Sequence, residues 1–193
     1  MSVLSKDFYE RDPALVANDL LGKILVRKIN SEILSGKIVE TEAYYGENDP
    51  ASKAYKGRKM FNELMFMDVG KAFIYMVHGN WLLNIVAHLK GDVGAVLIRA
   101  IEPLKGIETM RKNRNVKGVC DLASGPGKLT KALEITKELN GMDVTKKNSQ
   151  LLVVEGKSEG LQICSSHRIG VKADLPQKLR FFVNGSKFVS KFS

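Results

Sequence analysis

The stretch GKIVETEAYYG, residues 36–46, is the most informative part of this chain about both fold and chemistry. Its apolar start, Ile38-Val39, is typical of a β-strand. Alternate side chains of an extended strand share one face, so we expect Glu40, Glu42 and Tyr44 to lie side by side. A carboxylate beside an aromatic ring on a rigid strand suits acid–base chemistry on a flat substrate. The same pattern also fits an amphipathic edge strand whose acidic face is solvated.

The composition predicts one globular domain over residues 1–193. Of these 193 residues, 44% are hydrophobic and 26% are charged, which is enough for a sizeable core. No apolar run approaches the roughly 18 residues of a membrane-spanning helix, and the first residues lack the order of a signal peptide. Cys120 and Cys164 form no CxxC pair, which favours a reducing cytoplasm over a disulfide scaffold. The histidines are scattered and no cofactor motif is present, so we expect neither a metal nor a cofactor.

The chain carries a formal net charge of +9. An excess of this size often indicates a polyanionic partner, either nucleic acid or an anionic membrane surface, although solubility alone would also account for it. Residues 105–117 contain five basic residues, one acidic residue, Glu108, and no aromatic residue. This cluster favours contact with phosphate rather than base stacking. Its basic members are Lys105, Arg111, Lys112, Arg114 and Lys117.

Capping residues, turns and apolar periodicity predict an α+β fold. Strands joined by hairpins come first and helices are grouped later, which argues against alternating βαβ units. We expect strands at Ile24–Ile29, Ile33–Glu42, 72–78, 81–87, 94–101, 151–154, 168–172 and 179–184. We expect helices from Pro13, capped by Asp12, to Gly22, from Pro103 to Arg114, and from Ser124 to Glu138, and a turn at Gly79-Asn80.

Two motifs invite a catalytic interpretation. The SGPGK run at 124–128 fails as a phosphate loop because Leu129 follows Lys128 and an upstream glycine is missing. It remains either a helix start that holds one phosphate or simply a capped helix start. Glu40 and Glu42 would be about 7 Å apart, within the range of carboxylate pairs that hydrolyse sugars.

Aromatic residues and one histidine complete the candidates. Tyr44, Phe73, Tyr75 and Trp81 are of the type usually found in cores and sheets. His78 precedes a glycine at an expected hairpin tip, where a ring is either an ordinary surface residue or a wedge between DNA bases.

Four blocks of the sequence resemble one known family. They are LGKILVR at 21–27, VETEAY at 39–44, LIRAIEPL at 97–104 and SGPGKL at 124–129. In this order and spacing they resemble the alkyladenine (3-methyladenine) DNA glycosylases, monofunctional base-excision enzymes of mammals and many bacteria. The resemblance covers almost the whole chain. It implies a single α+β domain with a curved antiparallel sheet surrounded by helices and a positively charged DNA-binding face.

The resemblance also implies residue roles. Glu42 would be the general base that activates a water below C1′ of a flipped nucleotide, and Glu40 would lie outside that role. Tyr44 and Tyr75 match positions that stack on the extruded base. Asn84 matches a residue that rejects the exocyclic amine of guanine.

Further matches concern the DNA backbone, and two positions depart from the family pattern. Arg99 matches a residue that anchors the backbone of the flipped nucleotide. By the same resemblance, Lys128 would lie near a phosphate of the DNA. Lys53 stands where the family usually has a stacking histidine, and His78 stands at the intercalating position. Lys53 would contact a flanking phosphate, disfavour cationic bases, or attack the sugar as an amine.

We therefore expect a monofunctional DNA glycosylase that excises alkylated or deaminated purines from double-stranded DNA and leaves an abasic site. It would act in base-excision repair as a cytoplasmic, nucleoid-associated monomer without a membrane or cofactor. Two alternatives remain open at this point. One is a carbohydrate glycosidase that uses Glu40 and Glu42, and the other is a noncatalytic nucleic-acid-binding module on the same fold.

Overall fold

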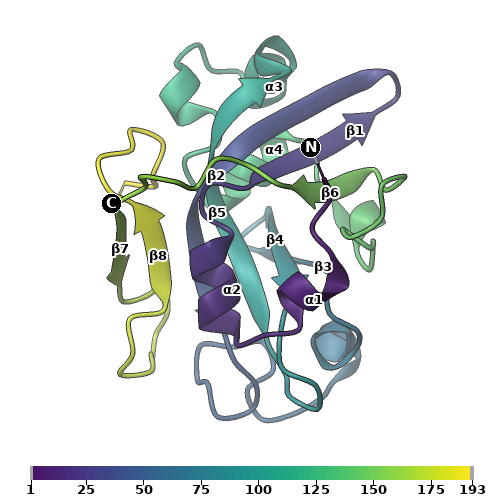
Figure 1. Ribbon diagram of the computed structural model, residues 1–193, viewed down its shortest axis with the longest axis vertical. Coiled ribbons are helices and arrows are strands. Elements are labelled where there is room, and N and C mark those ends of the chain that lie inside the picture. Colours follow the sequence, from purple (N-terminus) through teal and green to yellow (C-terminus); the bar gives the residue numbers. More distant parts are fainter. Residues whose placement is uncertain (1, 192–193) are drawn as a thin grey trace.

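A strongly bent antiparallel sheet, with helices around it, dominates the computed structural model, which describes residues 2–191 (Figure 1). Its central path runs β3-β4-β5-β2-β1-β6, and β8 pairs with β2 and carries β7. Among the described residues, no helix has the length and apolarity needed to cross a membrane. The strands are β1 (Ile24–Ile29), β2 (Glu32–Tyr44), β3 (Ala72–Val77), β4 (Asn80–Val86), β5 (Ala95–Lys105), β6 (Leu151–Val154), β7 (Ile163–Ser166) and β8 (Arg180–Val183).

β2 is the central strand of the molecule. It pairs with β1, β5 and β8, and its residues 38–44 are all buried. The interpretation of this segment as an edge strand with a solvated acidic face is therefore wrong. Gly36 makes the bend of β2 against β5 possible, because a Cβ there would lie 2.6 Å from Ile101 Cδ1. The α+β fold with a curved antiparallel sheet surrounded by helices is confirmed.

Helices cover the sheet and close the apolar core. Asp12 caps α2 by accepting hydrogen bonds from two backbone N–H groups, and Val16, Ala17 and Leu20 enter the core beside β2 and β5. Figure 1 shows α2 in front of the sheet and α4 behind it, where α4 packs on β4 and β5. The helices are α1 (Lys6–Tyr9), α2 (Pro13–Asp19), α3 (Ile107–Arg114), α4 (Pro126–Ala132) and the 3-10 turns η1 (Met60–Phe66), η2 (Val119–Asp121) and η3 (Lys137–Leu139).

The predicted strands at Ile24–Ile29 and 151–154 are confirmed to the residue. The predicted helix start at Pro103 is wrong, because Pro103 lies within β5 and α3 begins at Ile107. At Pro103, β5 extends beyond the end of β4 and pairs only with β2, where Pro103 lies opposite Gly36. A proline is tolerated there because its missing N–H removes no ladder hydrogen bond on the open side.

Several further boundaries differ from the predictions; the helix predicted to end at Gly22, for example, ends at Asp19. The predicted helix to Glu138 ends at Ala132, since Glu134 has a left-handed φ of 49°. The predicted strand 168–172 is wrong: those residues form an irregular loop, and the strand of this region is β7. The hairpin turn lies at His78-Gly79, one residue before the predicted position, because both residues have positive φ, the geometry of a tight two-residue hairpin.

Candidate active site

A cleft of about 520 Å³ brings together most of the residues expected from the sequence. It lies between the end of β2, the β3–β4 hairpin, the start of α4 and the loop after β7. None of its lining residues is Asp or Glu. The expected residues that line it are Tyr44, Lys53, Tyr75, His78, Arg99 and Lys128.

Glu42 lies directly behind the wall of this cleft and is 0% exposed. Its Oε2 accepts a hydrogen bond from the Tyr44 hydroxyl at 2.8 Å and lies 3.1 Å from Arg99 Nη1. Its Oε1 accepts the backbone N–H of Ile169 at 2.8 Å. Burial raises the pKa of Glu42, and Arg99, the Ile169 N–H and Tyr44 offset only part of that rise. The result is a carboxylate held by three cleft-lining residues and shifted toward neutral pH.

Glu40 is equally buried, but its surroundings favour the charged form. Its Oε1 accepts hydrogen bonds from Arg99 Nε at 2.8 Å, Arg180 Nε at 2.7 Å and the Ser190 hydroxyl at 2.7 Å. Its Oε2 accepts the Ser190 N–H at 2.7 Å. Burial raises the pKa of Glu40, but Arg99, Ser190 and Arg180 outweigh it and bring the pKa below its ordinary value. Glu40 is thus an anchor for Arg99 whose surroundings stabilise its charged form.

Environments that push two neighbouring carboxyl pKa values apart separate an acid–base group from an electrostatic support. Here Glu42 has the raised pKa and Glu40 the lowered one. A carbohydrate glycosidase needs both carboxylates to face one substrate. Neither glutamate lines the cleft itself, but the three partners of Glu42 all line it, whereas Glu40 is also held by Arg180 and Ser190, which do not.

Two tyrosines present rings to the cleft. Tyr44 is fixed by its hydroxyl on Glu42, and the guanidinium carbon of Arg168 lies 4.5 Å from its ring centroid. Tyr75 packs on Phe73 with ring centroids 5.1 Å apart, and burial raises the pKa of Tyr75 to about 12. Both hydroxyls therefore stay protonated at neutral pH, and both rings offer flat, electron-rich faces.

Asn84 lies behind the tyrosines rather than in the cleft wall. It is 2% exposed, and its Nδ2 donates to the Phe73 carbonyl oxygen at 3.2 Å.

The ammonium group of Lys53 lies 4.9 Å from the centroid of the Tyr75 ring. The backbone carbonyl of Lys53 accepts a hydrogen bond from Asn62 Nδ2 at 2.7 Å, which fixes the loop that carries it. Lys53 thus places a cation against one of the two cleft rings.

The tip of the β3–β4 hairpin is exposed and held rigidly at the edge of the cleft. His78 has a φ of 46° and Gly79 a φ of 76°. Thr130 of α4 donates to the Trp81 carbonyl at 2.7 Å, and a Cβ on Gly127 would lie 2.8 Å from Asn80 Cβ. This close approach presses the hairpin onto the start of α4, where Lys128 is exposed and also lines the cleft.

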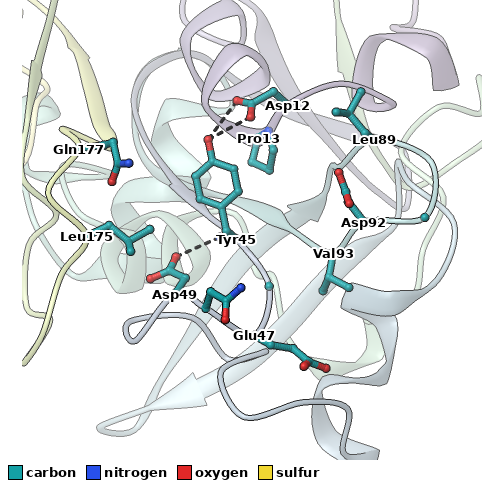
Figure 2. Close-up of a pocket in the computed structure, with 13 residues that line it drawn as sticks. Asp12, Pro13, Tyr45, Glu47, Asp49, Leu89, Asp92, Val93, Leu175 and Gln177 are labelled. Atoms are coloured by element: carbon teal, nitrogen blue, oxygen red, sulfur yellow. Dashed lines mark hydrogen bonds between the residues drawn. The ribbon is translucent and has the colours of Figure 1, made fainter.

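A second cavity, of about 690 Å³, lies around Tyr45 (Figure 2). Consecutive residues of an extended chain point to opposite sides, so Tyr44 and Tyr45 serve different cavities. The Tyr45 hydroxyl donates to Asp12, whose Oδ atoms are both 3.1 Å away. The acidic residues of this cavity are Asp12, Glu47, Asp49 and Asp92. A polyanion is therefore expected at the first cleft and not at this one.

Comparison with known proteins identifies the family. A family model described as methylpurine-DNA glycosylase (MPG) matches residues 7–187. The chain is 43% identical to a protein of Carboxydothermus hydrogenoformans, over 98% of this chain and 99% of that protein. A protein of Mesorhizobium japonicum is 42% identical over 93% of this chain and 86% of its own length, and one of Aeropyrum pernix is 41% identical over 98% and 93%. All three are provisionally named 3-methyladenine DNA glycosylase.

The chain belongs to the methylpurine-DNA glycosylase family. The resemblance drawn from four sequence blocks is therefore confirmed, and the chain is a hydrolase of the DNA glycosylase class. The alternative of a carbohydrate glycosidase is wrong.

The sequence indicated Tyr44 and Arg99, but it did not reveal the distant residues that hold the two glutamates of this glycosylase. Arg180 lies 140 residues from Glu40 along the chain and Ser190 lies 150 residues from it. Ser190 also follows the matched segment 7–187 of the family model. Arg168 was assigned to a strand that does not exist. No local pattern marks these residues, since their partners are set only by the packing of distant segments.

Proposed function

We propose that this glycosylase extrudes an alkylated or deaminated purine nucleotide from double-stranded DNA into the cleft and hydrolyses its N-glycosidic bond. The observation that carries the proposal is the position of Glu42. It is a buried carboxylate of raised pKa behind a cleft that has two tyrosine rings and no acidic lining residue. The product is an abasic site, which base-excision repair then processes.

In the chemical step, Glu42 accepts a proton from a water molecule below C1′ of the extruded nucleotide. The water oxygen bonds to C1′, and the bond from C1′ to the purine nitrogen breaks with its electron pair leaving on the base. A purine alkylated at N3 or N7 is cationic and leaves as a neutral molecule, so the bond is weak from the start. A general base in this role contributes roughly 10²–10⁴-fold in rate.

Arg99 supports this step in two ways. Its contacts with Glu40 and Glu42 orient the Glu42 carboxylate and balance the negative charge of the pair. As a cleft-lining cation, Arg99 also suits the phosphate beside the extruded nucleotide. Glu40, held by Arg180 and Ser190, keeps Arg99 in place.

Recognition of the damaged base is assigned to the rings of Tyr44 and Tyr75. A cationic purine on such a ring gains roughly 0.5–2 kcal/mol over a neutral one. Asn84, 2% exposed behind the cleft wall, is assigned to rejecting the exocyclic amine of guanine. His78 at the hairpin tip would fill the gap left in the duplex, and damaged bases unpair at lower cost than intact ones.

Lys128, exposed at the start of α4, is assigned to a backbone phosphate of the bound DNA. We infer that the protein acts on DNA as a monomer. A DNA substrate would bring the protein to the nucleoid.

The decisive experiment is single-turnover excision by the purified protein on duplex oligonucleotides, each with one lesion. The panel contains 3-methyladenine, 7-methylguanine, hypoxanthine and ethenoadenine, with undamaged duplex as the control. Release of the free base and alkali-labile strands from at least one lesion duplex is the expected result. Binding without base release from any of them would show a noncatalytic DNA-binding module instead.

A further inference from the structure

Arg168 is the most extensively bonded side chain beside the cleft, and the reaction as described above makes no use of it. Its side chain is 0% exposed and carries its charge between two carboxylates. Nη1 and Nη2 each donate to one Asp49 oxygen at 2.7 Å, while Nε and Nη2 donate to Asp174 Oδ1 at 2.8 and 2.6 Å. Nη1 also donates to the Ala43 carbonyl at 2.9 Å. Arg168 therefore ties the irregular loop after β7 to the end of β2.

The same guanidinium stacks on Tyr44. Its central carbon lies 4.5 Å from the ring centroid of Tyr44. Tyr44 lines the cleft and Arg168 does not, so Arg168 covers the ring face that is turned away from the cleft. The ring, which is 9% exposed and lines the cleft, cannot tilt without breaking contact with Arg168.

The next residue along the chain touches Glu42. The Ile169 N–H donates to Glu42 Oε1 at 2.8 Å, and its position follows from that of Arg168. Asp49 anchors the other end of this connection. It accepts the Tyr45 N–H at 3.0 Å, a contact visible in Figure 2, and the Ala51 N–H at 3.1 Å. Asp49 in the loop after β2 is thus hydrogen-bonded to Arg168, and the next residue in the chain, Ile169, is hydrogen-bonded to Glu42.

We propose that Arg168 is a positioning residue for base excision, which fixes the Tyr44 ring as a stacking platform and the Ile169 N–H as a partner of Glu42. The inference rests on the proposed function of this cleft. A lysine cannot replace Arg168, because only a planar guanidinium can bond two carboxylates and a carbonyl while lying flat on a ring. The loop that bears Ile169 has no strand pairing of its own, so Arg168 is its main attachment at the cleft.

The test compares Arg168→Lys and Arg168→Met with Arg11→Met. Arg11 is a matched control because it also bonds a carboxylate, that of Asp19, and stacks on a ring, that of Phe8, away from the cleft. We expect both Arg168 variants to lower kcat by about 10²-fold, as a small misplacement of catalytic groups does, with KM changed by less than about threefold. Arg11→Met should lose stability but keep kcat.

The pH profile separates positioning from general stabilisation. The Ile169 N–H lowers the pKa of Glu42, so losing that contact should raise this pKa and move the acid limb of kcat to higher pH. The other charged or titratable groups that face Glu42 are Glu40, Arg99, Tyr44 and Tyr75, and none of them is altered. If folded Arg168 variants keep the wild-type acid limb and kcat, Arg168 is structural only and the proposal is wrong.

Asp174→Asn supplies a milder variant in case Arg168→Met does not fold. Asp174 is partly exposed. Its replacement by Asn weakens one of the two ion pairs of Arg168 and leaves the pair with Asp49 intact. We expect the same shift of the acid limb with a smaller fall in kcat; an unshifted limb would contradict the proposal. A carboxyl NMR titration of Glu42 in wild type and Asp174→Asn reads the same effect without substrate. If wild type excises nothing, the proposed function fails, while this titration still decides the role of Arg168.

Discussion

At the scale of single residues, two glutamates on one face of β2 divide the work of the site. Both are 0% exposed and both contact Arg99. Glu40 has two further partners, Arg180 and Ser190, that favour its charge, whereas burial dominates at Glu42. One carboxylate is therefore an anchor, and the other, whose pKa is raised by burial, is the candidate for proton exchange.

Replacing Glu42 by Gln should abolish excision and leave DNA binding largely intact, because the amide keeps the shape but cannot accept a proton. We expect a loss of at least roughly 10²–10⁴-fold in single-turnover rate. Glu40→Gln is the matched control, with a far milder effect on the rate of folded protein. It should instead lower the free energy of unfolding by about 3–5 kcal/mol, since it leaves Arg99 and Arg180 without a full charge partner. A dead but stable Glu40→Gln variant would reverse the two roles.

The excision rate should fall as the pH is lowered, and the midpoint of this fall should lie above the ordinary pKa range of a glutamate. Burial raises the pKa of Glu42, and the base works only when it is deprotonated. The Tyr44 hydroxyl donates a hydrogen bond to Glu42, and this bond lowers the pKa of Glu42. Because Tyr44→Phe removes the bond, the acid limb should move to still higher pH. Tyr75→Phe, which removes a hydroxyl with no hydrogen bond to Glu42 among the described contacts, should leave the limb nearly unchanged. Equal shifts in both variants would contradict the assignment.

Lys53→His tests how the cation over Tyr75 affects lesion choice. The ammonium at 4.9 Å occupies the ring that a cationic purine would use, while an uncharged base such as hypoxanthine meets less repulsion. We expect a gain on 7-methylguanine relative to hypoxanthine. Lys56→His is the control, because Lys56 lies over Tyr55 outside the cleft. Equal changes on both lesions would assign Lys53 to a phosphate, and a borohydride-trapped adduct lost in the variant would indicate lyase chemistry.

At the scale of elements, the β3–β4 hairpin and α4 act as one unit that carries His78 to the edge of the cleft. The hairpin closes with two residues of positive φ, His78 and Gly79. Gly127 permits the contact with Asn80, and Thr130 bonds to the Trp81 carbonyl. A rigid tip of this kind suits insertion into a duplex, because the wedge does not have to be ordered on binding.

His78→Gly should weaken binding to lesion duplexes while sparing DNA that already has an abasic site or a gap. Glycine is the cleaner replacement, since it accepts the φ of 46° without strain, whereas alanine also disturbs the turn. Binding of both substrates is measured by fluorescence anisotropy, with His78→Ala in parallel. An equal loss on stacked and already open DNA would argue against a wedge.

At the scale of the whole molecule, charge is distributed unevenly between the two main cavities. The cleft of the proposed reaction is lined by Lys53, Arg99 and Lys128 and by no acid, whereas four acidic residues line the cavity around Tyr45. With a net charge of +9, this arrangement orients a polyanion toward the cleft.

DNA affinity should therefore fall steeply with salt, with a log–log slope of a few units for several phosphate contacts. Lys128→Gln and Lys112→Gln, at the cleft and in the basic cluster of residues 105–117, should each reduce the slope by about one. Lys6→Gln is the control, because Lys6 of α1 pairs with Asp68 and neither residue lines the cleft. A nearly flat salt response of wild type would exclude DNA as the natural partner.

The sequence by itself determined the family, the strand pattern around β2 and Glu42 as the candidate base. The strand pattern follows from neighbours a few residues apart, through alternation, caps and turns. The family and the choice of Glu42 over Glu40 come from the resemblance of short motifs to known DNA glycosylases. Only the tertiary structure decided that Glu40 is an anchor, that Arg168 holds Tyr44, and that Pro103 belongs to β5. Each of those outcomes depends on partners far along the chain, such as Arg180 and Ser190 at 140 and 150 residues from Glu40. Burial and long-range pairing set the pKa of a carboxylate, and neither is encoded in its local sequence.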